Sequence, residues 1–153
     1  MPTFALNFSR PGAQVVGQYY NFLRFGFGGH AAVQGYAREV AMRLAREIES
    51  LGPFELLTRG DALSVFAFKL VNEIKNYTVF DLSNALRARG WQLPAYTFPK
   101  NRTDLAALRV VVRRGVTHDL ADLLISDIER ALALLERKAA AVHTSETSTS
   151  FHH

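Results

Sequence analysis

The stretch Val65-Phe-Ala-Phe-Lys-Leu70 predicts a β-strand, because aromatic and β-branched side chains fit the pleated surface of a sheet. Similar stretches lie on both sides of it along the chain. A short apolar run at residues 54–57 precedes it, and residues 93–98 and 108–112 follow it as two further runs rich in such side chains. The sequence therefore predicts a small sheet built around residues 65–70.

Two helices are predicted between and after these strands. Thr78 is expected to cap the first helix, with Asp81 at its third position, and Gly90 is expected to end it. Thr117 is expected to cap the second helix. The apolar positions of that helix share one face, namely Leu120, Leu124, Ile128, Ala131 and Leu135. The order strand, strand, helix, strand, strand, helix predicts an α+β fold in which helices cover one face of a small antiparallel sheet.

Residues 1–52 are expected to form a strand and a helical arm at a domain or dimer interface. Residues 3–8 predict a strand, and residues 14–23 predict a helix that the glycines at 26, 28 and 29 interrupt. A long helix then runs to Ser50, with a stripe at Val33, Tyr36, Val40, Leu44 and Ile48. Exposed, the many large apolar side chains of the arm would form a patch unusual for a soluble monomer. We therefore expect the arm to pack against another domain, a second subunit, or both.

The remaining residues divide into a small domain and a tail. The small α+β domain is expected to span residues 53–140, after Gly52 and Pro53 stop the long helix. From about residue 141 the sequence is dominated by threonine, serine, glutamate and histidine without periodicity. Residues 141–153 are therefore expected to form a flexible tail.

Composition restricts the classes of protein that the chain can represent. Its 153 residues, 48% of them apolar, fit one domain or one small domain with an arm. The absence of cysteine excludes disulfides and thiolate metal sites and suits a cytoplasmic protein. No apolar run reaches the roughly 18 residues of a membrane span. No phosphate loop, nucleophile elbow or metal-ligand pattern occurs, and Gly26-Phe-Gly-Gly29 is too weak to indicate a phosphate site.

The formal net charge of +4 raises the alternative of a nucleic-acid-binding protein. The arginines, however, are interspersed with carboxylates, as in Arg38-Glu39 and Arg46-Glu47. This pattern favours a solvated helix face with ion pairs between successive turns. Nucleic-acid binding remains an alternative, which a steep dependence of affinity on salt would support.

Three stretches carry a resemblance to a known family. They are Thr3-Phe-Ala-Leu-Asn-Phe-Ser-Arg-Pro-Gly-Ala-Gln-Val-Val-Gly-Gln-Tyr-Tyr-Asn-Phe-Leu-Arg24, residues 90–98, and Thr103-Asp-Leu-Ala-Ala-Leu-Arg-Val-Val-Val-Arg-Arg-Gly115. They resemble the C-terminal portion of glutamate decarboxylases, group II pyridoxal-phosphate decarboxylases that convert L-glutamate to 4-aminobutyrate and CO2. The resemblance covers nearly the whole chain. It implies the small domain of an aspartate-aminotransferase-like, fold type I enzyme.

The same resemblance implies what this portion would lack. In the family, the lysine that holds the cofactor and most phosphate contacts lie upstream of the position of Met1. We therefore expect no catalytic residue in this chain, and we expect the chain alone to be inactive and unlikely to retain pyridoxal phosphate. The segment from Phe25 to His30 departs from the family pattern, because it lacks an arginine and a glutamate usual there.

The resemblance assigns candidate roles to individual residues. Arg109 matches the arginine that binds the substrate α-carboxylate, and a guanidinium suits this task because its planar fork grips a carboxylate in a fixed plane. Phe8 and Ser9 match residues that contact the cofactor phosphate of a neighbouring subunit. From the residues alone, Arg109 could instead be a surface arginine on a strand edge, and Ser9 could merely belong to a turn that starts the helix.

The C-terminal histidines are candidate regulatory residues. His153, and next to it His152, match a family tail in which a histidine plugs the active site at neutral pH. Histidine suits such a switch because its ordinary pKa is about 6.5. A disordered end or the remnant of an affinity tag explains the same residues.

The resemblance also implies partners. The chain is expected to associate with the missing cofactor-binding portion or another decarboxylase subunit, to form part of a homo-oligomer, and to act on L-glutamate. An alternative of another class is a non-catalytic module that docks on a full-length decarboxylase subunit. A decarboxylase for a related amino acid is a further alternative, because the residues that read the glutamate side chain are not in this chain.

Overall fold

The computed structural model describes residues 11–74 and 76–148. The chain divides into two compact units, Met1–Gly35 and Tyr36–His153. The division falls inside helix α1 (Ala13–Ser50), whereas the sequence predicted an arm that ends at residue 52. The difference arises because residues of α1 beyond Tyr36 belong to the core of the second unit.

Within the first unit, α1 is broken at Gly26. The backbone there has φ 55° and ψ −168°, a conformation outside the helical region that glycine adopts at low cost. Gly28 and Gly29, which were also expected to interrupt the helix, are helical. The strand predicted for residues 3–8 lies outside the described residues.

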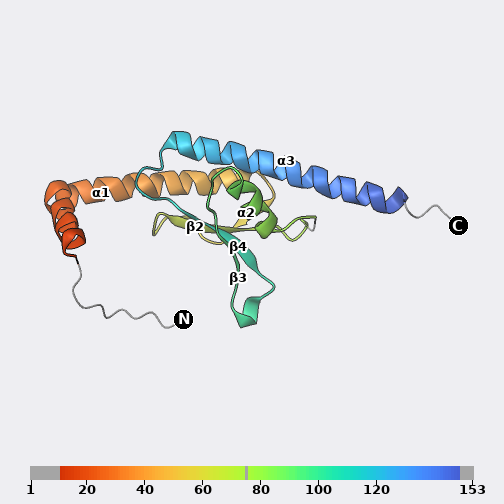
Figure 1. The fold of residues 1–153 in the computed structure, drawn as a ribbon, viewed down its shortest axis with the longest axis horizontal. Coiled ribbons are helices and arrows are strands. Elements are labelled where there is room, and N and C mark those ends of the chain that lie inside the picture. The colour runs from red at the N-terminus through yellow and green to blue at the C-terminus, as the bar shows by residue number, and fades with distance from the viewer. Residues whose placement is uncertain (1–10, 75, 149–153) are drawn as a thin grey trace. The chain divides into compact units, whose positions relative to one another are not determined.

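The second unit contains a four-stranded antiparallel sheet in the order β1-β2-β4-β3 (Figure 1). The strands are β1 (Phe54–Leu56), β2 (Val65–Leu70), β3 (Ala95–Thr97) and β4 (Ala106–Val111). β2 has the predicted bounds, and β4 starts two residues earlier than predicted. β3 is shorter than the predicted 93–98, because the carbonyl of Leu93 accepts a hydrogen bond from a helix side chain rather than from a strand.

Strand register decides which residues of the sheet face the core. Phe66 lies opposite Val110, and Phe68 lies opposite Leu108. All four side chains are buried. Because successive side chains of a strand point to opposite faces, Ala67 and its partner Arg109 lie on the other face. The sheet therefore has one apolar core face and one face that carries Arg109.

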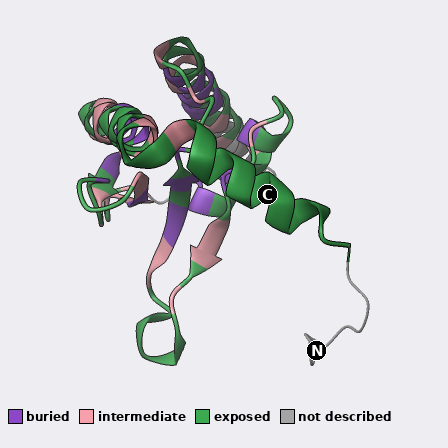
Figure 2. Cartoon of the chain, turned by 90° about the vertical axis from the view of Figure 1, so that its left-hand side faces the viewer, coloured by how far each residue is buried: buried purple, intermediate pink, exposed green. Residues whose placement is uncertain are grey.

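Helices cover the core face. They are the Tyr36–Ser50 part of α1, α2 (Val79–Arg87) and α3 (His118–Ser148), with a short 3-10 turn η1 (Lys100–Arg102) between β3 and β4. Buried residues gather where these helices meet the strands (Figure 2). The predicted stripes are largely confirmed: the fully buried side chains include Val40, Leu44, Ile48 and Ile128. Tyr36 and Leu120 remain 42% and 39% exposed. The α+β fold predicted from the sequence is confirmed.

The last helix extends past residue 140, where the small domain was expected to end. α3 continues to Ser148, beyond residue 141, where a flexible tail was expected to begin. Residues 149–153 lie outside the described residues. Among the described residues, no helix is long and apolar enough to cross a membrane.

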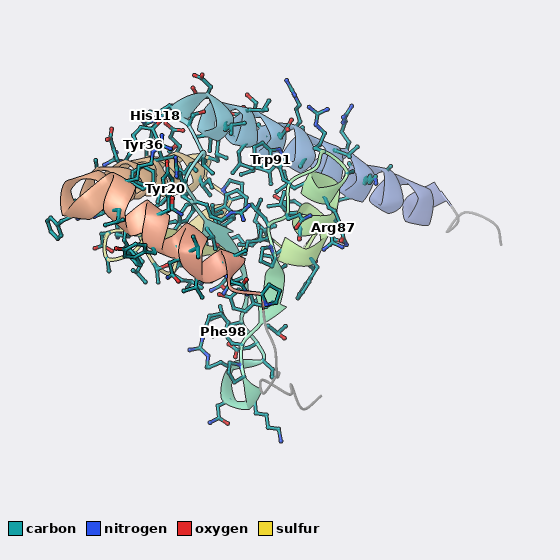
Figure 3. The ribbon with its side chains drawn as sticks, turned by 60° about the vertical axis from the view of Figure 1, so that its left-hand side comes forward. Tyr20, Tyr36, Arg87, Trp91, Phe98 and His118 are labelled. Atoms are coloured by element: carbon teal, nitrogen blue, oxygen red, sulfur yellow. The ribbon has the colours of Figure 1, made fainter. Side chains whose placement is uncertain are left out.

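Both ends of α2 are fixed by local hydrogen bonds. The Asp81 amide donates to the Thr78 hydroxyl at 3.3 Å, and the Thr78 amide donates to the Asp81 carboxylate at 2.8 Å. This is the predicted capping box. At the other end, the Gly90 amide donates to the Arg87 carbonyl and the Trp91 amide to the Leu86 carbonyl, with Gly90 at φ 92° (Figure 3 labels Arg87 and Trp91). Gly90 therefore ends the helix in a Schellman arrangement.

Replacing Thr78 by alanine is expected to destabilise the chain by about 1 kcal/mol, because the amide of Asp81 loses its acceptor at the helix start. Equilibrium unfolding in urea would measure the change. Thr78→Ser is the matched control, since it keeps the hydroxyl and is expected to stay within a few tenths of a kcal/mol of the original chain. Equal losses in both variants would contradict a capping role.

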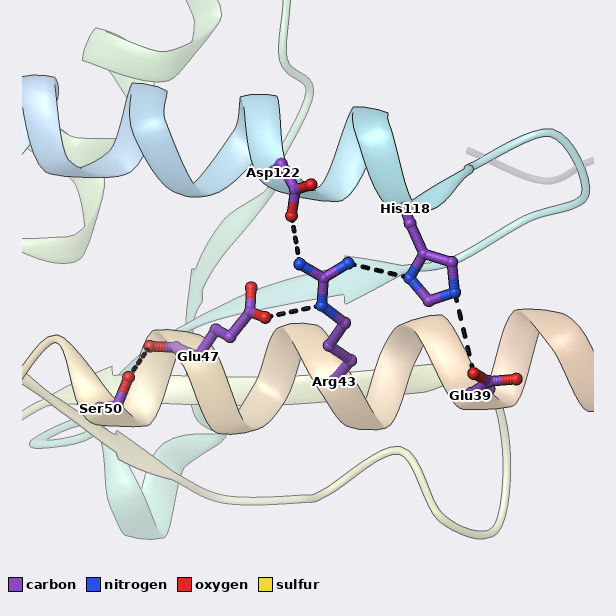
Figure 4. Close-up of polar contacts among 6 residues, drawn as sticks. All are labelled: Glu39, Arg43, Glu47, Ser50, His118 and Asp122. Carbon is purple, nitrogen blue, oxygen red and sulfur yellow. Dashed lines mark hydrogen bonds and ion pairs between the residues drawn. The ribbon is translucent and has the colours of Figure 1, made fainter.

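A cluster of charged side chains joins α1 to the start of α3 in the second unit (Figure 4). The Arg43 guanidinium donates to Glu47 at 2.7 Å and to Asp122, and its third contact is Nδ1 of His118 at 3.0 Å. Nε2 of His118 lies 3.8 Å from Glu39. His118 therefore connects the two helices.

Candidate functional site

Arg109 projects from β4, the strand that lies between β2 and β3. Its partner on β2 is Ala67, whose side chain is small and leaves room above the sheet. The Arg109 amide donates to the Pro94 carbonyl at 3.2 Å, which ties β4 to the segment before β3. The side chain itself is exposed. Arg109 is therefore held at its backbone and open at its guanidinium.

Two further arginines share a hollow with Arg109. Its volume is about 690 Å³, and its lining residues are Arg87, Gln92, Leu93, Pro94, Arg109, Val111 and Arg113. Arg87 comes from the last turn of α2, and Arg113 follows β4. Among the described residues, none of these three guanidiniums has an ion-pair partner, and no carboxylate lines the hollow. The hollow is therefore strongly cationic.

Polar contacts fix the wall of this hollow. The buried Ser83 hydroxyl of α2 donates to the Leu93 carbonyl at 2.5 Å. The Trp91 amide donates to the Leu86 carbonyl at 3.1 Å. With the bond between Arg109 and Pro94, these contacts hold the segment from residue 91 to 94 at several points. The arginine hollow therefore has a firm side made by residues between α2 and β3.

A buried carboxylate of α3 also contacts the segment 91–94, through the side chain of Trp91. Asp127 of α3 is 3% exposed and accepts the Trp91 indole N–H at 2.9 Å. It also accepts from Arg89 Nε at 3.1 Å and from Arg130 at 3.0 Å. The indole hydrogen bond, followed by those from Arg89, lowers the pKa of Asp127 below its ordinary value, although burial opposes this effect. Asp127 therefore stays ionised and links α3 to Trp91, which directly precedes the lining residue Gln92.

The side chains of this hollow are suited to an anion. Guanidiniums are planar donors that match carboxylates, and three of them line one hollow. Among the described residues, no lysine lines this hollow, and Lys69 is paired with Glu55 at 2.7 Å on the sheet. The donor set of the hollow therefore suits a carboxylate or another anion. Among the described residues, no group of side chains suited to a metal ion occurs.

The structure describes one of the predicted site residues. Arg109 lies in the cationic hollow. Phe8, Ser9, His152 and His153 lie outside the described residues.

Sequence reasoning missed the other two arginines of the hollow. The period of two along an extended chain would have placed Arg113 on the side of Arg109. No pattern in the sequence brings Arg87 there, because it lies on α2 and reaches the hollow only through the packing of α2 beside β3 and β4.

Comparison with known proteins gives relatives over the whole chain. No family model matches it. A glutamate decarboxylase of Aliivibrio fischeri is 40% identical over 156 residues, which cover 100% of this chain and 34% of that protein. A probable glutamate decarboxylase gamma of Listeria innocua is 36% identical, covering 99% of this chain and 32% of that protein. The chain therefore spans about a third of the length of these curated relatives.

Solved structures share the fold. Glutamate decarboxylase of Lactobacillus brevis superposes with a TM-score of 0.82 at 40% identity, covering 88% of this chain and 31% of that chain. A sphingosine-1-phosphate lyase of Burkholderia pseudomallei superposes with a TM-score of 0.66 at 18% identity, covering 96% of this chain and 31% of that chain. The fold is thus that of pyridoxal-phosphate enzymes of fold type I. Within that class, the chain is homologous along its length to glutamate decarboxylases and corresponds to a C-terminal portion of them.

Proposed function

We propose that this chain forms part of a cytoplasmic, pyridoxal-phosphate-dependent glutamate decarboxylase, which converts L-glutamate to 4-aminobutyrate and CO2. The observation that carries the proposal is the position of Arg109, in a cationic hollow without a competing carboxylate. An arginine in that setting is available to a carboxylate ligand. The identity of 40% with a glutamate decarboxylase over the whole chain supports the same substrate class.

Arg109 would bind the α-carboxylate of the substrate and hold it in one plane. The backbone contact with Pro94 fixes where the side chain leaves β4, and the planar fork of the guanidinium favours a single orientation of the carboxylate. Pyridoxal phosphate, when bound to the complete enzyme, supplies the acceptor for the electron pair that remains after CO2 departs. The contribution of this chain is therefore to orient the group that is lost, while a lysine elsewhere in the complete enzyme anchors the cofactor.

The proposal includes partners for the chain. The cofactor-binding portion, or another subunit of a homo-oligomer, would complete the site, and Phe8 and Ser9 would contact the cofactor phosphate there. His152 and His153 would close the site near neutral pH. In support of a partner, the first unit exposes large apolar side chains, among them Phe27 at 92% and Leu23 at 67%.

The same exposed side chains favour a second candidate function, a non-catalytic module that docks on a complete decarboxylase subunit. Tyr19 and Phe22 of α1 are 63% and 57% exposed, so an apolar surface is available without any role in chemistry. Association with a complete subunit without a gain in activity would favour this second function.

The proposal is tested by reconstitution. The preceding portion of the Aliivibrio fischeri relative is produced separately, mixed with this chain and pyridoxal phosphate, and supplied with carboxyl-labelled glutamate. We expect labelled CO2 from the mixture and none from either part alone. A mixture that associates but releases no CO2 would reject the catalytic proposal, and release of CO2 by this chain alone would reject its dependence on a second part.

A further inference from the structure

We propose that Arg87 and Arg113 form a second anion subsite beside Arg109, which binds a small anion carrying at least two negative charges. Both side chains line the same hollow as Arg109 and come from different elements. The carboxylate proposed for Arg109 neutralises only one of the three guanidiniums. The inference concerns the other two and does not require that the chain take part in decarboxylation.

Charge is the first argument for this subsite. Positively charged groups that line one hollow repel one another, and an anion that contacts them removes this repulsion. Elsewhere in the described residues some arginines are paired, such as Arg43 with Glu47 and Asp122 and Arg89 with Asp127. Others, such as Arg46 and Arg59, have no ion pair there but do not line the hollow. Arg87 and Arg113 have no such partner among the described residues. What distinguishes Arg87 and Arg113 is that they line one hollow with Arg109 and no carboxylate, a setting that an anionic ligand would neutralise.

Shape is the second argument. The volume of the hollow, about 690 Å³, is within the range of sites for small molecules. Its neutral lining includes Gln92, whose side-chain amide can donate and accept hydrogen bonds. It also includes Pro94, whose side chain forms no hydrogen bonds and so does not compete with the ligand for the arginine donors. The wall from residue 91 to 94 is held by the contacts of Ser83 and Asp127, so the subsite has a fixed side. A compact, multiply charged oxyanion fits this combination better than a long polymer.

The test measures binding of inorganic phosphate to the isolated chain, without pyridoxal phosphate and at constant ionic strength. Arginine side-chain Nε–H signals in NMR report occupancy directly. We expect saturable shifts, and we expect Arg113→Ala and Arg87→Ala each to weaken phosphate binding about 10-fold, since each removes a charge-assisted donor. Chloride at the same ionic strength is expected to produce no saturable shift, because it carries only one charge.

Arg46→Ala is the matched control, because Arg46 is an exposed arginine of α1 that does not line the hollow. It removes the same charge and is expected to change phosphate affinity less than twofold. The proposal is overturned if phosphate does not saturate, if chloride binds as well, or if Arg46→Ala weakens binding as much as Arg113→Ala. Because the assay contains no decarboxylation step, its failure leaves the reconstitution result intact, and the reverse also holds.

Discussion

Replacing Arg109 by alanine is expected to lower kcat/KM for glutamate about 100-fold or more in the reconstituted decarboxylase. The variant loses the planar donor that would hold the scissile carboxylate, and misplacement of a reacting group by about 1 Å can cost this much in rate. Labelled CO2 release, measured over a range of glutamate concentrations, separates an effect on kcat from an effect on KM. A loss in kcat would show that the guanidinium orients the carboxylate as well as binding it.

Two further variants make this prediction specific. Arg109→Lys keeps the positive charge but loses the fork, so its kcat/KM is expected to lie between those of the alanine variant and the original chain. Arg59→Ala removes an exposed arginine from the connection between β1 and β2 and is expected to leave kcat/KM within twofold. Both side chains, Arg109 and Arg59, are exposed, so thermal unfolding of the three variants should be little changed. Activity above half of the original in Arg109→Ala would remove Arg109 from the site.

The local elements of the fold could be predicted because they depend on short patterns. Val65-Phe-Ala-Phe-Lys-Leu70 gave a strand with the observed bounds, and Thr78 with Asp81 gave the observed capping box. The order of strands could not be predicted in this way. β3 follows α2 along the chain yet lies at the edge, with β4 inserted between it and β2, and this order depends on contacts between distant residues.

The division of the chain into two units between residues 35 and 36 could not be predicted from local sequence patterns either. The helix stripe at Val40, Leu44 and Ile48 was recognised, but only tertiary packing shows that these residues belong to the core beneath the sheet. Similarly, the composition after residue 141 indicated a tail, whereas α3 continues to Ser148. The three alanines at 139–141 have a high helix propensity and extend the helix beyond the apolar stripe, whereas propensity does not account for its continuation over residues 143–148.

Of the residues that line the hollow, the sequence singled out only Arg109, through its family match, and its role stays a prediction. Asp127 shows what sequence reasoning missed. It occupies a position on the apolar face of α3, between Leu124 and Ile128, where a carboxylate is unexpected. That signal was present in the sequence, but its partners Trp91 and Arg89 are more than thirty residues away. A buried charge of this kind indicates a partner without identifying it.

Replacing Asp127 by asparagine is expected to lower the midpoint of thermal unfolding at pH 7 by about 5 °C or more. The variant is nearly the same size, but it loses the negative charge that faces Arg89 and Arg130. An amide can still accept from the Trp91 indole, so the expected loss comes from the two cations. Because Asp127 also supports the wall at residues 91–94, the variant should weaken phosphate binding in the hollow as well.

The stability that ionised Asp127 contributes is expected to decrease as pH falls. Its pKa in the folded chain is lowered, because the indole N–H of Trp91, and then Arg89, stabilise the ionised form. The unfolded chain therefore binds this proton at a higher pH, near the ordinary value of about 3.9. Stability contributed by the charge is fully present above that value and is lost as pH falls through the lower, folded pKa. The difference between the original chain and Asp127→Asn should accordingly shrink below pH 4.

Glu129→Gln provides the matched control, because Glu129 is an exposed carboxylate on the same helix. It removes the same charge, and its unfolding midpoint at pH 7 is expected to stay close to that of the original chain. Equal midpoints for Asp127→Asn and Glu129→Gln would show that the buried carboxylate contributes only to net charge. A difference that persists unchanged from pH 7 to pH 3 would show instead that packing of the side chain, rather than its ionised form, holds α3 against the wall of the hollow.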